Sequence, residues 1–226
     1  MEYWSTSANA EVRAAIIALP HLRRLTLLIS PHSPFTAEDI GRLTTTELVD
    51  LELDYSGASL SDDDLKYVAT HSKLERLSLT DTNISDAGLA HLAPLENLRF
   101  LNLEATNVSG VGLSQLRCSE SLTMLVVTGD ALSDEGLGVI SQFPNITKLI
   151  VAGRNITEEG LEQLLALKHL QHIMIGDIRP TPHNVMRRLA REIPCHVSYS
   201  YTLKNGKEDR HDKAPDEGDA VSTPND

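Results

Sequence analysis

Apolar and polar residues follow two alternating patterns along most of this chain. The segment LSLTDTNISDAGLAHL (residues 77–92) begins with every second residue apolar, which predicts a short strand with one buried face. It continues with an apolar anchor, Ile84, and a serine, and then with Leu89 and Leu92 at helical spacing. The segment LNLEATNVSGVGLSQL (residues 101–116) repeats both patterns 24 residues later. The chain therefore repeats a unit made of a strand and a short helix.

The repeating unit occurs seven times in phase. Its strand half has the form L-x-x-L-x-L, and its starts are 26 residues apart twice and then 24 residues apart: Leu22, Leu48, Leu74, Leu98, Leu122, Ile146 and Leu170. One more step of 24 residues reaches PCHVSYSY, residues 194–201, which predicts an eighth strand. One unit is too small to bury its own leucines, whereas stacked units bury each other's. We predict an α/β solenoid with right-handed crossovers, parallel strands on the concave face and short helices on the convex face.

A hydroxyl residue follows the apolar anchor and marks the start of each predicted helix: Thr36, Ser61, Ser85, Ser109, Ser133 and Thr157. Its side chain can accept a hydrogen bond from a helix N–H group, and the acids that often follow it suit a helix N-terminus. Three residues after the hydroxyl stands a glycine (Gly88, Gly112, Gly136, Gly160), or Asp39 and Asp64 in the two longer repeats. We expect the missing Cβ to let helix and strand approach closely.

These motifs closely resemble those of the leucine-rich-repeat family. The best match is the variant L-x-x-L-x-L-x-x-T-x-I-[ST]-D-x-G-L, which is common in bacterial repeat proteins and similar to the cysteine-containing repeats of eukaryotic F-box proteins. The resemblance extends from Leu22 to about Tyr201. It implies a right-handed β-α superhelix and a role in recognition rather than catalysis.

The two ends of the chain are predicted to differ from the repeats. Residues 1–21 contain ANAEVRAAIIAL, whose helical spacing predicts a capping helix for an incomplete first coil. The leucine-rich repeats and the last strand occupy residues 22–203, and TPHNVMRRLAREIP predicts a longer helix over residues 182–192. Residues 204–226 contain no large apolar residue except Val221, which predicts a disordered acidic tail.

Composition narrows the classes of partner. Hydrophobic residues make up 41% of the 226 residues and aromatic residues only 4%, so the core must be aliphatic. A formal net charge of −12 argues against nucleic acid and anionic membranes as partners. The first residues show no export signal, and Cys118 and Cys195 would lie about four coils apart, too far to form a disulfide. We therefore expect a soluble, cytoplasmic protein.

The sequence contains no recognisable catalytic motif. The strongest alternative is a pair of histidines, His172 and His196, which the repeat places on adjacent strands, with Asp177 near them in the sequence. Two imidazoles and a carboxylate could hold zinc. Surface histidines without a metal are commoner on such a scaffold, so we predict no catalytic residue, no cofactor and no metal site.

The residues that alternate with the leucines point out of the concave side of the sheet. Early in the chain they include acids on one strand, Asp50, Glu52 and Asp54. Later they form a contiguous apolar group: Phe100, Met124, Val126, Ile150 and Met174. A contiguous apolar group usually marks an interaction site, although strand propensity, a second copy or the chain's own tail would also account for it.

These observations favour a non-enzymatic protein–protein interaction module that binds a protein or peptide through its concave sheet. The apolar group would supply the anchors, and the acidic strand would orient a basic segment of the partner. Two alternatives are a substrate-recognition adaptor similar to F-box-associated repeat proteins and a self-assembling structural scaffold.

Overall fold

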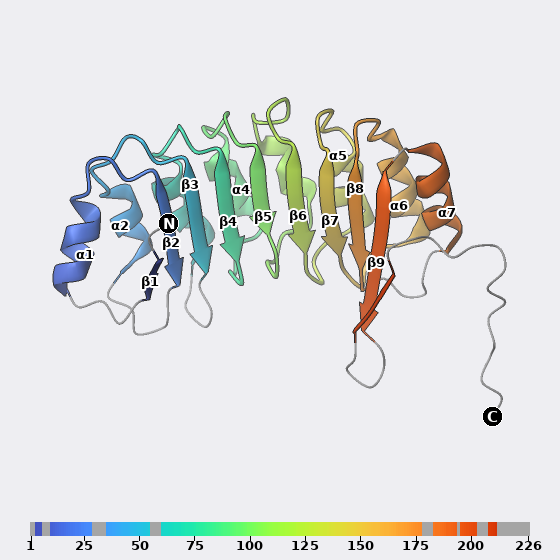
Figure 1. Ribbon diagram of the computed structural model, residues 1–226, viewed down its shortest axis with the longest axis horizontal. Helices are drawn as coiled ribbons and strands as arrows, with labels where there is room; N and C mark the ends of the chain where they lie inside the picture. Colours follow the sequence, from blue (N-terminus) through green and yellow to red (C-terminus); the bar gives the residue numbers. More distant parts are fainter. Residues whose placement is uncertain are drawn as a thin grey trace.

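The described strands form one continuous sheet, which is parallel except at its last strand. The computed structural model describes residues 3–5, 10–28, 35–54, 60–177, 183–193, 195–202 and 208–211. Within these residues the sheet has ten strands, and neighbours follow the order of the chain (Figure 1). The strands are β1 (Tyr3–Ser5), β2 (Arg24–Leu28), β3 (Asp50–Asp54), β4 (Arg76–Thr80), β5 (Phe100–Leu103), β6 (Met124–Thr128), β7 (Lys148–Ala152), β8 (His172–Gly176), β9 (His196–Thr202) and β10 (Glu208–His211).

The register between strands is the one that the repeat predicts. Leu77 pairs with Leu101, and Leu101 pairs with Leu125, so equivalent residues of successive repeats lie side by side. The predicted eighth repeat strand is β9, in which His196 pairs with His172. Strands β1 to β9 are parallel, and β10 runs antiparallel to β9.

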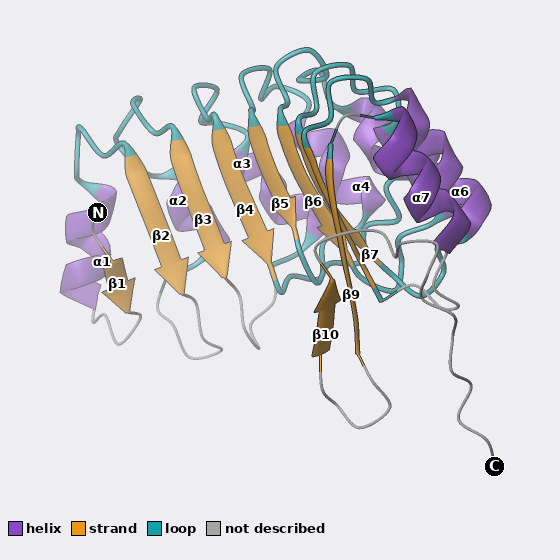
Figure 2. Ribbon diagram, turned by 45° about the vertical axis from the view of Figure 1, so that its right-hand side comes forward, coloured by secondary structure: helices purple, strands orange, loops and turns teal. Residues whose placement is uncertain are grey.

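Short helices cover one face of the sheet, as Figure 2 shows. The α-helices are α1 (Ala10–Ile17), α2 (Ala37–Gly41), α3 (Leu65–Val68), α4 (Asp86–Leu89), α5 (Asp134–Ile140), α6 (Glu158–Gln163) and α7 (His183–Glu192). Four 3₁₀ turns complete the layer in the described residues: Asp62–Asp64, Ala90–Leu92, Val111–Gln115 and Leu164–Ala166. The predicted α/β leucine-rich-repeat solenoid, with strands on one face and helices on the other, is therefore confirmed.

One aliphatic cluster fills the space between the two layers. Strand leucines such as Leu77 and Leu101 and helix leucines such as Leu89 and Leu113 are completely buried in it. The anchors Ile84 and Val108 lie in the same cluster. Since every coil contributes to this one cluster, a coil is held in place by its neighbours. In the described part of the chain, no helix combines the length and the apolar character that crossing a bilayer would require.

Both ends of the solenoid carry more structure than the sequence indicates. At the N-terminus, β1 pairs with β2, so the first coil has a strand as well as the predicted capping helix, which is α1. At the C-terminus, the longer helix predicted over residues 182–192 is α7, and it buries Val185, Met186 and Leu189.

The prediction of a disordered tail over residues 204–226 is wrong for Glu208–His211. These four residues form β10. An edge strand such as β9 presents unpaired backbone N–H and C=O groups, which even a polar segment can satisfy. The other residues of the predicted tail lie outside the described residues.

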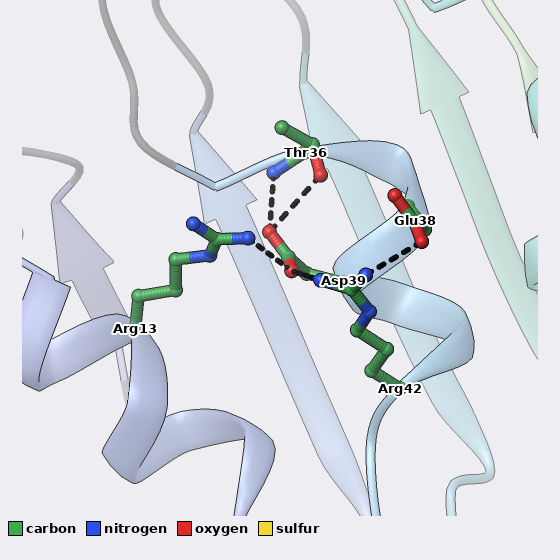
Figure 3. A network of polar contacts seen from close by, with 5 residues as sticks. All are labelled: Arg13, Thr36, Glu38, Asp39 and Arg42. Atoms are coloured by element: carbon green, nitrogen blue, oxygen red, sulfur yellow. Dashed lines mark hydrogen bonds and ion pairs between the residues drawn. The ribbon is translucent and has the colours of Figure 1, made fainter.

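A buried carboxylate ties the capping helix to the first repeat (Figure 3). Asp39 is fully buried, and its Oδ1 lies 2.6 Å from Nη2 of Arg13 on α1. Its other oxygen accepts hydrogen bonds from the backbone N–H (2.8 Å) and the hydroxyl (3.0 Å) of Thr36. Burial by itself raises the pKa of Asp39, but the bonds from Arg13 and Thr36 outweigh it and hold the pKa below its ordinary value.

Carboxylates also cap the later helices, and they come from one of two places. Asp64 belongs to the same turn that it caps, where it accepts from N–H (2.9 Å) and Oγ (2.6 Å) of Ser61. Elsewhere the carboxylate comes from the preceding coil. Asp62 accepts from N–H (2.8 Å) and Oγ (2.6 Å) of Ser85, and Asp134 does the same for Thr157 (2.9 and 2.6 Å). The bonds of Asp62 and Asp134 therefore join their coils to the coils that follow.

The recurring glycines make room for these bonds between coils. A Cβ on Gly88 would overlap the carboxylate of Asp62, and a Cβ on Gly160 would overlap that of Asp134. The expectation that these glycines let helix and strand approach is therefore wrong. The close approach is between the starts of two successive helices.

One coil lacks the capping carboxylate and uses a backbone carbonyl in its place. Before Ser133, the position of Asp62 and Asp134 is taken by Gly110, whose φ of +95° favours glycine. Both N–H and Oγ of Ser133 donate to the carbonyl oxygen of Ser109, at 3.1 and 3.3 Å. A Cβ on Gly136 would overlap that same oxygen. The two coils are therefore in direct backbone contact.

Replacing Arg13 with alanine is expected to lower the free energy of unfolding by about 1–3 kcal/mol at neutral pH, because it removes the nearer of two arginines that face a buried carboxylate and leaves Arg42, at 3.6 Å. The exposed Arg117→Ala is the matched control, with an expected loss below about 1 kcal/mol. Asp39 has a lowered folded-state pKa, so its contribution is complete above the ordinary aspartate pKa of about 3.9 and is lost as the pH falls through the lower value. Urea unfolding across acid pH measures both effects. Equal losses for the two variants at neutral pH would contradict the assignment.

Two glycines of α5 provide a matched test of the contact between coils. Gly136→Ala is expected to lower the free energy of unfolding by about 1–3 kcal/mol, because the new Cβ meets backbone. In Gly138→Ala the new Cβ meets only the end of the Gln163 side chain, so stability should change by less than about 1 kcal/mol. Denaturant unfolding of both variants checks this, and a Gly136→Ala protein as stable as Gly138→Ala would contradict it.

Candidate partner-binding face

The face of the sheet opposite the helices, here called the open face, is left uncovered by the described helices (Figure 2). Because the strands pair in register, equivalent outward residues form rows across it. The first row, at the strand starts, is Arg24, Asp50, Arg76, Phe100, Met124, Lys148, His172 and His196. The middle row is Thr26, Glu52, Ser78, Asn102, Val126, Ile150, Met174 and Ser198. The last row begins with Leu28, Asp54, Thr80, Glu104, Thr128, Ala152 and Gly176.

The structure brings the predicted apolar residues together on four neighbouring strands, β5 to β8. Phe100 pairs with Met124, while Val126 pairs with Ile150, which pairs in turn with Met174. We call these five residues the apolar patch. Met174 is 38% exposed, and Phe100, Met124 and Ile150 are half-buried. Val126 is only 5% exposed and forms the floor of the patch.

An arginine borders the apolar patch on the side of the early repeats. The guanidinium of Arg76 lies 4.2 Å from the ring centroid of Phe100, in a cation–π contact. Its Nε is also 3.6 Å from Oδ2 of Asp50, and Nε of Arg24 is 3.9 Å from the same oxygen. Sequence reasoning missed Arg76, although its place between Asp50 and Phe100 in the first row was visible in the repeat.

The three predicted acids lie on β3, but their surroundings differ. Asp50 is half-buried, and its charge is balanced by the two arginines. Glu52 is exposed and accepts a hydrogen bond from the Thr26 hydroxyl at 3.2 Å. Asp54 is half-buried at the end of the strand. The negative charge that this strand can offer a partner is therefore smaller than its sequence indicates.

The two predicted histidines are neighbours in the first row. The ring centroids of His172 and His196 are 5.9 Å apart, with the rings tilted by 57°. Across the described residues, no group of three His, Cys, Asp or Glu side chains is placed to hold one metal ion. Burial raises the pKa of the Cys118 thiol to about 11, which keeps it protonated and unreactive at neutral pH. The described side chains of the open face thus form an apolar and charged surface.

Comparison with known proteins adds little to this description. No family model matches the chain, and no curated protein matches it. Among solved structures, it is similar to an internalin from Listeria monocytogenes, with 17% sequence identity and a TM-score of 0.45. The match covers 87% of this chain and 65% of the internalin chain. The strand order, the register and the single helix layer identify the fold as an α/β leucine-rich-repeat solenoid.

Proposed function

We propose that this protein is a non-enzymatic interaction module that binds a protein or peptide partner through its open face. The observation that carries the proposal is the apolar patch, which spans four adjacent strands and includes a methionine that is 38% exposed. Contiguous apolar surface on a soluble protein typically marks an interaction site, whereas single exposed apolar residues do not.

The patch has the properties of a good anchor. Phe100 presents an aromatic ring whose orientation is held by Arg76, and burying such a ring contributes strongly to an interface. Met124 and Met174 have flexible side chains that adapt to the shape of a partner. All the patch residues stand on paired strands, so binding orders little backbone and loses little conformational entropy.

The charges of the protein support a protein partner. A net charge of −12 repels nucleic acid and anionic lipid, both of which require clustered positive charge. Glu52 has an exposed carboxylate, and Asp54 lies two residues further along the same strand, β3. The negative charge of Glu52 favours a partner with a basic segment facing this strand. A cytoplasmic location remains a prediction from the sequence.

Replacing Ile150 and Met174 together with glutamate tests the proposal. Both side chains reach the surface, so the fold should survive, whereas a charge at the floor residue Val126 would be buried and would unfold the protein. The double variant is expected to lose the partner in affinity capture from an extract of the source cells, read by mass spectrometry. Ala166→Glu, at an exposed position of the helix layer, is the matched control and should retain the partner.

Thermal unfolding of the variants must accompany the capture, so that loss of fold is not mistaken for loss of binding. Capture of the same proteins by the wild type and the folded double variant would rule out the apolar patch as the binding surface. A mass that increases with concentration in the wild type but not in the double variant would instead assign the patch to a second copy of the chain.

A further inference from the structure

The apolar patch lies between two borders of opposite charge. At the strand starts, the first row carries the exposed side chains of Arg76, Lys148, His172 and His196, of which the arginine and the lysine are cationic. At the strand ends, the exposed acids are Glu104 and, in the turns that follow the strands, Asp81 and Asp130. Among the side chains that the structure describes on that side, the one base is Arg154, whose Nε is 3.7 Å from Oδ1 of Asp130. The open face is therefore basic on one side of the patch and acidic on the other.

The spacing of the middle row favours one kind of secondary structure in the partner. Val126, Ile150 and Met174 stand on successive strands, which are about 4.8 Å apart. A helix laid across the strands repeats its contacts every turn, at about 5.4 Å. An extended segment repeats its same-side residues at about 6.8 Å. The mismatch between each repeat and the strand spacing accumulates over the three intervals from β5 to β8. It reaches about 2 Å for a helix and about 6 Å for an extended segment.

We infer that the partner segment is an amphipathic α-helix lying across β5 to β8. Its apolar stripe sits on the patch, its acidic side chains face Lys148 and His172, and its basic side chains face Glu104 and Asp130. This inference rests on the proposed function and adds the shape and the charge pattern of the partner. The opposite charges on the two borders discriminate against a helix whose acidic and basic sides are exchanged.

Selection from two displayed libraries tests the shape of the partner. One library carries randomised positions on a stable helix, and the other carries them on an extended hairpin strand. Both are selected against the full-length wild-type chain, with removal of clones that bind the Ile150→Glu/Met174→Glu variant. We expect enrichment of helices with apolar residues at i, i+4 and i+7, an acidic side and a basic side. Each should lose at least tenfold in affinity for the double variant.

Enrichment of extended segments, of helices with exchanged charged sides, or of nothing from either library would overturn the inference. Extended binders that still require Ile150 and Met174 would leave the proposed function standing. If the wild type and the folded double variant capture the same proteins from the extract, both proposals fail. The two failures are thus distinguishable.

Charge exchange tests the orientation of the selected helix. Lys148→Glu is expected to weaken binding about three- to fivefold at low salt, and the loss should disappear at high salt. Replacing the acidic side chains of the selected helix with lysine should restore the affinity for Lys148→Glu. The matched control is Lys66→Glu on α3 of the helix layer, which should leave binding unchanged. Binding that is indifferent to Lys148, or a loss that the lysine helix does not restore, would overturn the orientation.

Discussion

No coil of this protein can bury its own leucines, so every coil depends on being in register with its neighbours. The parallel ladder supplies that register on the sheet side, where Leu77, Leu101 and Leu125 lie side by side. A mismatch of one residue would turn the leucines toward solvent and the polar residues into the core. The same register creates the rows of the open face. The partner surface is therefore a direct consequence of the way the core is built.

The helix layer keeps register by a second interaction, in which a carboxylate of one coil caps the next. Asp62 and Asp134 reach forward to Ser85 and Thr157, and the coil that receives each carboxylate has glycine at the third helical position. Where the preceding coil offers Ala37 instead, Ser61 is capped by Asp64 of its own turn. An acid in one repeat and a glycine in the next thus form a single structural unit that crosses the repeat boundary.

The sequence predicts the order of the elements, the register and the residues of the open face, because all three follow from one period. It predicts less well how those residues are surrounded. Val126 is placed correctly in its row, yet its neighbours on both adjacent strands bury it. Asp50 reads as an available acid, yet arginines from two strands balance its charge. Contacts between neighbours in a row depend on the rotamers of long side chains, which a period does not specify.

The ends of the chain show a second limit of the sequence. Strands β1 and β10 lack the leucine pattern, and they form because the edges of a sheet present unpaired backbone groups that accept almost any sequence. Composition described Glu208–His211 as a solvated tail, and backbone pairing overrides that description. The repeat pattern therefore predicts the middle of the solenoid better than its ends.

The central claim is that the apolar patch of the open face contacts the partner while the core stays unchanged. NMR of the protein labelled with ¹³C at its methionine methyl groups tests this most directly. Met124 and Met174 belong to the patch, whereas Met186 is 1% exposed on the core side of α7, where it serves as an internal reference. Saturation with the captured partner should shift the signals of Met124 and Met174 and leave that of Met186 in place. Signals of Met124 and Met174 that do not move at saturation would contradict the account.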